Sequence, residues 1–254
     1  NYCLTLFIKF QALKLLNKDY FFKGVIMNTK NKSYQPVSPD NQKLISNSDM
    51  ELISKQHLLE MQSRHTIRDF SDRKVSYSII KNCLRTACSA PSGANLQPWH
   101  FSVISSPSVK SQIRKAAEIE EQKFYNDIKK DEWLTALEPF GTHPSKPHLE
   151  VAPWLIVVFS ERYGELEDGT KRKNYYVPES VGIATGFLIS ALHLSGLSCL
   201  THTPNPMGFL SKICNRPSSN KASLILAVGH AAEDVKIPLA STVKNPYKEV
   251  VSVF

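Results

Sequence analysis

Three polar residues, Glu121, Tyr125 and Lys146, are spaced so that they could surround one small molecule. Glu121 and Tyr125 are four residues apart, so in a helix both side chains leave the same face. Lys146 follows in a segment broken by proline and glycine, residues 138–147, which could fold back over that face. A carboxylate, a phenol and an ammonium group complement both charges of a free amino acid. We therefore expect Glu121 to bind the ammonium of such a ligand, and Lys146 and Tyr125 its carboxylate; the alternative is a solvated helix face.

A second polar group lies upstream, in the sequence Arg64-His-Thr-Ile-Arg68. In an extended backbone, Arg64, Thr66 and Arg68 point to the same side. Guanidinium groups offer paired donors to phosphate oxygens. The pattern therefore fits a phosphate cradle, and an exposed basic strand is the alternative.

Residues 90–99 have the sequence Ala-Pro-Ser-Gly-Ala-Asn-Leu-Gln-Pro-Trp. Pro91 and Gly93 predict a turn. Ser92 and Ala94 are too small to block a flat ring, and small residues let backbone N–H groups approach a ligand closely. The segment therefore favours a ligand-binding loop over an ordinary one.

These motifs resemble those of the nitroreductase superfamily of FMN proteins, from about Arg64 to the C-terminus. That superfamily opens with an Arg-x-[Ser/Thr]-x-Arg segment and carries a Pro-Ser loop that ends in Pro-Trp. The spacing of the residues at 121, 125 and 146 resembles the substrate lid of its iodotyrosine deiodinase subgroup, which other nitroreductases lack. Further similar segments are Ala152-Pro-Trp-Leu-Ile156, Thr201-His-Thr-Pro204 and Arg216-Pro217.

The resemblance implies a set of FMN contacts: Arg64, His65, Thr66, Arg68, Pro91, Ser92, Gly93, Thr201, His202, Thr203 and Lys244. Ser92 and Gly93 would come from the partner subunit, since the family binds FMN at a dimer interface. Thr203 would be catalytic, its hydroxyl bonding flavin N5 so that electrons pass one at a time. The Ala94 backbone N–H would hold the substrate phenolate.

Three of the implied cofactor contacts depart from the family pattern. His65 replaces an arginine, His202 interrupts a threonine triplet, and Lys244 replaces an arginine. At position 244 the charge is kept but the bidentate fork is lost, so FMN binding is expected but its tightness is not fixed by the resemblance.

The implied activity is FMN-dependent reductive dehalogenation of halogenated tyrosines such as mono- and diiodotyrosine, releasing halide and tyrosine. NAD(P)H would supply electrons directly or through a reductase. The alternatives are a generalist NAD(P)H-dependent nitro or quinone reductase, and a non-catalytic flavin- or ligand-binding protein. No histidine spacing typical of a metal site occurs, so no metal is predicted.

Charge and cysteine content further narrow the possible classes of protein. The net charge is +8, but the basic residues are scattered, Lys171-Arg-Lys173 is the only tight cluster, and no nucleic-acid motif accompanies it. The five cysteines are odd in number and include no Cys-x2-Cys pair, which indicates buried thiols in a reducing compartment. We therefore expect a cytoplasmic protein without a nucleic-acid partner.

The sequence predicts two regions: a disordered leader at 1–47, and an FMN domain at 48–254 with a lid at about 121–150. Residues 1–26 precede the first methionine, Met27, and are expected to be an artefactual extension. They are too short and too charged for a stable membrane span. Membrane association through them is the alternative.

Hydrophobic periodicity predicts an α+β fold, and the resemblance implies a central mixed sheet flanked by helices, in a domain-exchanged homodimer with an extended C-terminal tail. A capping box predicts the first helix at 48–63, with Leu52, Leu58 and Leu59 towards a core. The other predicted helices span 76–89, 108–130, 179–194 (central and buried) and 209–214. The predicted strands span 99–104, 154–159, 197–203 and 224–229, and the last twenty residues are expected to be extended.

Overall fold

The computed structural model describes residues 34, 36–38, 44–127, 131–166 and 168–254. The chain divides into two units, Asn1–Ser46 and Asn47–Phe254, and the second unit carries every element described below. The predicted leader at 1–47, with its extension at 1–26, lies almost wholly outside the described residues. The predicted helix end at Lys130 also lies outside them.

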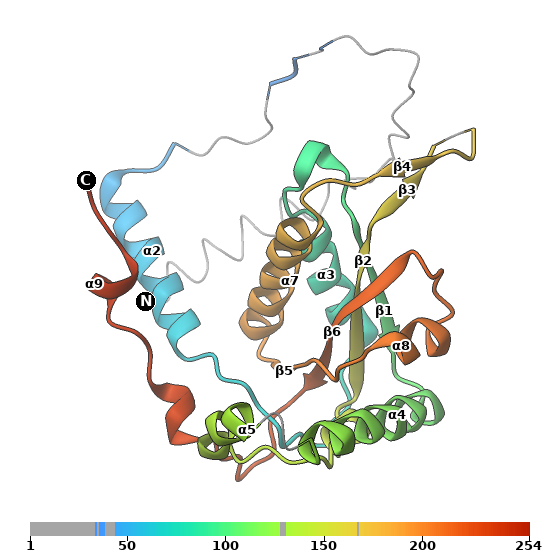
Figure 1. Cartoon of the computed structure of the whole chain (residues 1–254). Coiled ribbons are helices and arrows are strands. Elements are labelled where there is room, and N and C mark those ends of the chain that lie inside the picture. The colour runs from blue at the N-terminus through green and yellow to red at the C-terminus, as the bar shows by residue number, and fades with distance from the viewer. Residues whose placement is uncertain (1–33, 35, 39–43, 128–130, 167) are drawn as a thin grey trace. The chain divides into compact units, whose positions relative to one another are not determined.

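Helices flank one four-stranded sheet in the second unit (Figure 1). The longer helices are α2 (Asn47–Gln62), α3 (Tyr77–Cys88), α4 (Pro107–Tyr125), α5 (Asp131–Leu137), α7 (Val177–Leu194) and α8 (Gly208–Ile213). Short helical turns are η1 (Gly93–Asn95), η3 (Glu138–Phe140), α6 (His148–Val151), η4 (Leu239–Thr242) and α9 (Tyr247–Val250). The sheet has the order β1 (Trp99–Ile104), β2 (Trp154–Glu161), β6 (Asn220–Gly229), β5 (Ser198–His202). A separate antiparallel pair consists of β3 (Tyr163–Glu165) and β4 (Lys171–Lys173).

The three ladders of the sheet are antiparallel. At the β5 edge, a parallel bridge between Thr66 and Cys199 ties the stretch before α3 to the sheet, which gives it a mixed character. This bridge and the bond from the Ile67 N–H to the Cys199 carbonyl oxygen place residues 66–67 beside β5, whereas Phe70 pairs with Ala231 beyond the end of β6. The predicted α+β fold with a mixed sheet is confirmed.

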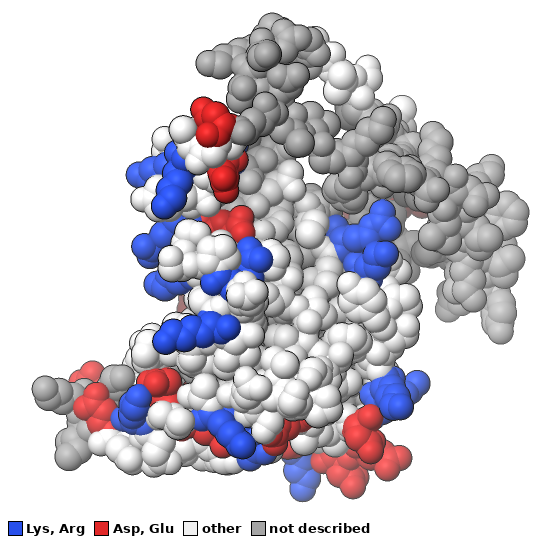
Figure 2. All heavy atoms as spheres, turned by 90° about the vertical axis from the view of Figure 1, so that its right-hand side faces the viewer, with Lys and Arg blue, Asp and Glu red and all other residues white. Residues whose placement is uncertain are grey.

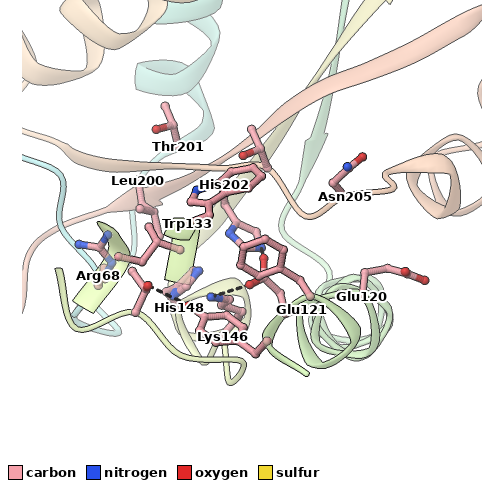
Figure 3. Close-up of a pocket in the computed structure, with 15 residues that line it drawn as sticks. Arg68, Glu120, Glu121, Trp133, Lys146, His148, Leu200, Thr201, His202 and Asn205 are labelled. Atoms are coloured by element: carbon pink, nitrogen blue, oxygen red, sulfur yellow. Dashed lines mark hydrogen bonds and ion pairs between the residues drawn. The ribbon is translucent and has the colours of Figure 1, made fainter. Parts of the chain in front are cut away.

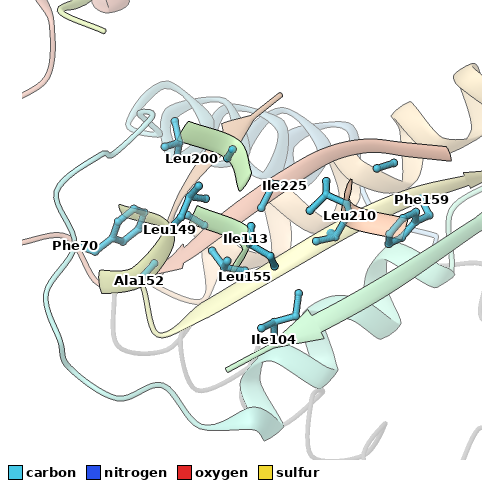
Figure 4. Close-up of a cluster of buried hydrophobic side chains, with 14 residues drawn as sticks. Phe70, Ile104, Ile113, Leu149, Ala152, Leu155, Phe159, Leu200, Leu210 and Ile225 are labelled. Atoms are coloured by element: carbon cyan, nitrogen blue, oxygen red, sulfur yellow. The ribbon is translucent and has the colours of Figure 1, made fainter. Parts of the chain in front are cut away.

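Strand β2 lies at the centre of the core because both of its faces are covered. Leu155 and Val157 pack with α4 and α8 on one side of the sheet (Figure 4), and Ile156 packs with α3 and α7 on the other. Each of these three side chains is fully buried. Burial of such a side chain is worth roughly 1.5–3 kcal/mol. A strand buried on both faces explains why residues 154–159 form one continuous apolar run.

Most of the predicted elements are present with small shifts of their ends. The helix predicted at 76–89 is α3, and the Ser76 Oγ at its N-cap accepts a bond from the Ser78 N–H at 3.3 Å. The strand predicted at 99–104 is β1. The long polar helix ends at Tyr125, with Asn126 as its cap. The tail is largely extended but contains η4 and α9, two helical turns that were not predicted.

The prediction that Leu52, Leu58 and Leu59 face a core is wrong. These side chains are 43%, 54% and 57% exposed, and no residue of α2 is buried. The reason is that α2 meets α7 at its C-terminal end, where His193 Nε2 lies 2.8 Å from the Glu60 carbonyl oxygen.

Helix α7 was predicted to be central and buried, and this holds for one face only. Leu188 and Leu192 pack into the core, whereas Ile183 and Phe187 are exposed. By length and composition alone, α7 could cross a membrane. Its packing against the sheet along one face is typical of a core helix.

The face shown in Figure 2 keeps the scattered distribution of charge seen in the sequence. On the face shown in Figure 2, Lys and Arg side chains lie among Asp and Glu, most densely along the lower edge.

Candidate active site

Glu121, Tyr125 and Lys146 converge on one cavity. Helix α4 presents Glu121 and Tyr125 one turn apart, and Lys146 reaches them from the segment before α6 (Figure 3). Lys146 Nζ lies 3.0 Å from Glu121 Oε2, and the two side chains are only 9% and 13% exposed. The same Nζ lies 5.6 Å from the centroid of the Tyr125 ring, and the Tyr125 hydroxyl donates to Thr142 Oγ1 at 2.8 Å. The three groups therefore form a nearly buried ion pair beside a phenol.

The cavity has a volume of about 240 Å³, and its wall combines elements that are far apart in sequence. Helix α4 forms one side, and β5 with the loop after it forms another, bringing in Thr201, His202 and Thr203. Arg68 enters from the stretch beside β5, and Trp133 enters from α5. Trp133 was not singled out in the sequence, where an isolated tryptophan gives no sign of its neighbours.

Two buried histidines lie beside the ion pair in the wall of the cavity. His148 and His202 are 7% and 8% exposed, and their rings meet edge to face at 5.5 Å. The Nε2 of each has no hydrogen-bond partner among the described residues, and His202 Nε2 lies 3.7 Å from Glu121 Oε1. His148 was not predicted as a site residue, because nothing in the sequence marks it as buried.

Burial keeps both imidazoles neutral. It lowers the pKa of His148 to about 4, and the charges of Lys146 and Arg68 add to this effect. Burial likewise lowers the pKa of His202 to about 3, with further contributions from His148, Lys146 and Arg68. The contact between His202 and Glu121 is therefore one between a neutral ring and a carboxylate at neutral pH, not an ion pair.

The structure divides the Arg64–Arg68 stretch between two cavities. Arg64, His65 and Thr66 line a second cavity of about 230 Å³, and Lys244 from the C-terminal region lines it with them. Arg68 lines the first cavity instead. Alternation predicts one cradle, whereas Arg68 lines a different cavity from Arg64 and Thr66; this stretch joins the sheet by isolated bridges at Thr66 and Phe70 and not as a regular strand. The cofactor role of Arg68 stays a prediction.

The Pro91–Ala94 loop lines neither of these cavities. Its Gly93 N–H donates to Ser180 Oγ at 3.3 Å, which ties the loop to the start of α7. A Cβ on Gly93 would lie 2.8 Å from Tyr176 Cδ2, so only glycine fits there without a shift. Ala94 has a φ of 50°, which costs a residue with a side chain roughly 1–2 kcal/mol. Strained backbone of this kind gathers at ligand-binding sites.

The chain belongs to the nitroreductase family, whose family model matches residues 61–230. A protein of Haliscomenobacter hydrossis named iodotyrosine deiodinase is 52% identical over 190 residues, which cover 74% of this chain and 86% of that protein. An iodotyrosine deiodinase of Nematostella vectensis is 36% identical over 204 residues, covering 80% and 76% of the two chains. The crystal structure of an oxidised iodotyrosine deiodinase bound to FMN and 3-iodo-L-tyrosine superposes with a TM-score of 0.64 at 32% identity, over 78% of this chain and 98% of that one. The family predicted from the motifs is confirmed.

The buried histidine pair predicts a specific loss of stability in acid. Because their pKa values lie below the ordinary 6.5, the stability conferred by the neutral rings is complete above about pH 6.5 and is lost as pH falls towards 4 and then 3. For His148 alone, the free energy of unfolding should fall by roughly 2–3 kcal/mol between about pH 7 and pH 4.5. Urea unfolding at pH 7 and at pH 4.5 measures this change in the free energy of unfolding.

In a variant with both His148→Gln and His202→Gln, the free energy of unfolding should depend less on pH. The exposed-site control His57→Gln should behave like wild type. Parallel curves for wild type and the double variant would contradict this account.

Proposed function

We propose that this chain is an FMN-dependent oxidoreductase that reductively removes halide from halogenated tyrosines such as mono- and diiodotyrosine. The observation that carries the proposal is the nearly buried pair of Glu121 and Lys146 beside Tyr125, in a cavity that also receives Thr203. Relatives named iodotyrosine deiodinase support it, and one such structure holds FMN and 3-iodo-L-tyrosine.

The ion pair explains selection of a zwitterion. Taking Glu121 and Lys146 out of water costs free energy that their mutual attraction offsets, and breaking such a pair by removing one partner is strongly destabilising. A free amino acid brings one charge for each partner: its ammonium for the Glu121 carboxylate, and its carboxylate for the Lys146 ammonium and the Tyr125 hydroxyl. The ligand thus exchanges one internal ion pair for two with the protein. A singly charged ligand would leave one protein charge buried without a partner.

The donor groups of the two cavities fit FMN. Arg64, Thr66 and Lys244 offer a guanidinium fork, a hydroxyl and an ammonium group in one cavity, a set suited to a phosphate. Arg68 and Thr203 line the neighbouring cavity, where they would face the ring system and the reacting end of the substrate. When bound, FMN supplies the two electrons that, with one proton, replace the halogen by hydrogen and release halide. The electron donor is NAD(P)H, directly or through a reductase.

A homodimer would complete this site. In the proposed assembly the Pro91–Ala94 loop of the partner contributes to the cofactor pocket, and its Ala94 N–H bonds the substrate phenolate. Exposed apolar side chains on α2 and α7, among them Leu58, Ile183 and Phe187, support burial against a second copy. The described cysteines are free thiols, consistent with the reducing, cytoplasmic environment that we propose.

The proposed activity predicts iodide release. Protein loaded with FMN and reduced anaerobically with dithionite should release iodide from 3-iodo-L-tyrosine and form tyrosine in equal amounts. Iodide can be quantified with a selective electrode and tyrosine by chromatography. Turnover of nitroaromatics with NADPH but no iodide release would contradict the proposal in favour of a generalist reductase. Binding of FMN without either turnover would indicate a non-catalytic flavin protein.

Glu121→Gln should weaken the binding of 3-iodo-L-tyrosine roughly tenfold to a hundredfold, because a charge-assisted contact in a desolvated site is lost. Binding of 2-iodophenol, which carries neither charge, should change less than about twofold. In wild-type protein, 3-iodotyramine, which lacks the carboxylate, should bind more weakly than 2-iodophenol because it separates Glu121 from Lys146 without replacing both charges.

Quenching of flavin fluorescence measures these affinities. Glu132→Gln, which removes the same charge from an exposed position on α5, is the matched control and should leave them unchanged. If Glu121→Gln weakened the binding of all three ligands equally, recognition of a zwitterion would be contradicted.

A further inference from the structure

The segment that carries Lys146 runs back along α4. This returning segment, residues 145–152, meets the helix at successive levels. On the helix, Lys110, Arg114, Glu118, Glu121 and Tyr125 are separated by four, four, three and four residues, so they form one stripe. The stripe therefore includes the two binding residues of the site and three residues that no part of the proposed chemistry uses.

Glu118 holds the main chain of Lys146. The Lys146 backbone N–H donates to Glu118 Oε1 at 2.6 Å, and the Ser145 hydroxyl donates to the same oxygen at 3.4 Å. Glu118 lies three residues before Glu121, so one turn of α4 contacts Lys146 twice: Glu118 binds its backbone and Glu121 binds its side chain.

Arg114 fixes Glu118 in turn. Its Nε donates to Glu118 Oε1 at 2.8 Å, and its Nη1 donates to Glu150 Oε2 at 2.6 Å. Arg114 therefore joins a carboxylate on α4 to a carboxylate on the returning segment. Burial alone would raise the pKa of Glu118, but the bonds from Lys146 and Arg114 outweigh it and hold the pKa below its usual range. Glu118 is therefore charged at neutral pH.

The base of the returning segment is buried. Lys110 Nζ donates to the Glu150 and Ala152 carbonyl oxygens at 2.7 and 2.8 Å. Leu149 and Ala152 are fully buried in the core formed with α4. The segment is thus anchored at its C-terminal end by Lys110 and the core, and its main chain is held at Lys146 by Glu118.

We propose that Glu118, oriented by Arg114, is a positioning residue that sets the height of Lys146 along α4 and thereby contributes to the selection of zwitterionic ligands. This inference rests on the proposed function. The bond at the Lys146 N–H fixes its backbone, so ligand binding does not have to remove that main-chain freedom. Without Glu118, the Lys146 backbone would lose the bond that fixes its position along α4, and a ligand carboxylate would have to order the residue that carries Nζ. A neutral ligand does not contact Nζ, so its affinity should not change.

The test compares two ligands in FMN-loaded Glu118→Ala protein. The affinity for 3-iodo-L-tyrosine should fall about tenfold, and the affinity for 2-iodophenol should stay within about twofold. Glu118→Gln keeps an oxygen for the Lys146 N–H but loses the charge, so its effect should be intermediate. Glu161→Ala is the matched control, because Glu161 pairs with Arg216 at 3.5 Å at similar exposure in another part of the structure. It should leave both affinities unchanged.

Hydrogen exchange at the Lys146 amide gives a second measurement that does not depend on ligand. Exchange should speed up in Glu118→Ala and stay at the wild-type rate in Glu161→Ala. An equal loss of affinity for both ligands in Glu118→Ala, or an unchanged affinity for 3-iodo-L-tyrosine, would overturn the positioning role. If wild-type protein itself fails to bind 3-iodo-L-tyrosine, the proposed function fails and the exchange rate alone decides whether Glu118 positions Lys146.

Discussion

The ion pair between Glu121 and Lys146 joins two of the segments that enclose the site, helix α4 and the segment leading into α6. Both side chains are about nine-tenths buried, so each requires a charged partner in every state of the site. In the ligand-free protein the two charges satisfy each other. A ligand that separates the pair must replace both partners or leave a charge uncompensated. The chemistry of the site therefore follows from electrostatic compensation more than from the shape of the cavity.

The rest of the fold keeps these groups in place. Strand β2, buried on both faces, holds the sheet, and β5 with the loop after it brings Thr201 and Thr203 to the cavity. Ile113 and Ala117 fix the other face of α4 in the core. Beside the pair, His148 and His202 supply a polar but neutral wall, so these two rings add no charge next to Glu121 and Lys146 at neutral pH.

Local patterns predicted most of the fold and part of the site. The hydrophobic spacing that predicts a helix at 76–89 lies within one element, and α3 is found there with each end shifted by one residue. The spacing of Glu121 and Tyr125 is equally local. Features that depend on contacts between distant segments could not be predicted: the exposure of Leu58 on α2, the separation of Arg68 from Arg64, and the pairing of His148 with His202. No periodicity records which elements will meet, so neither the histidine wall nor the hold of Glu118 on Lys146 is visible in the sequence.

A double-mutant cycle on Glu121 and Lys146 tests the central claim most directly. The free energy of unfolding would be measured for wild type, Glu121→Gln, Lys146→Met and the double variant, without ligand and with saturating 3-iodo-L-tyrosine. Without ligand, the two substitutions should couple by roughly 1–3 kcal/mol, since removing one partner strands the other. With ligand bound, the direct coupling should shrink because each residue then pairs with the ligand. Additive effects in the ligand-free protein would contradict the account, because Glu121 and Lys146 would then not depend on each other.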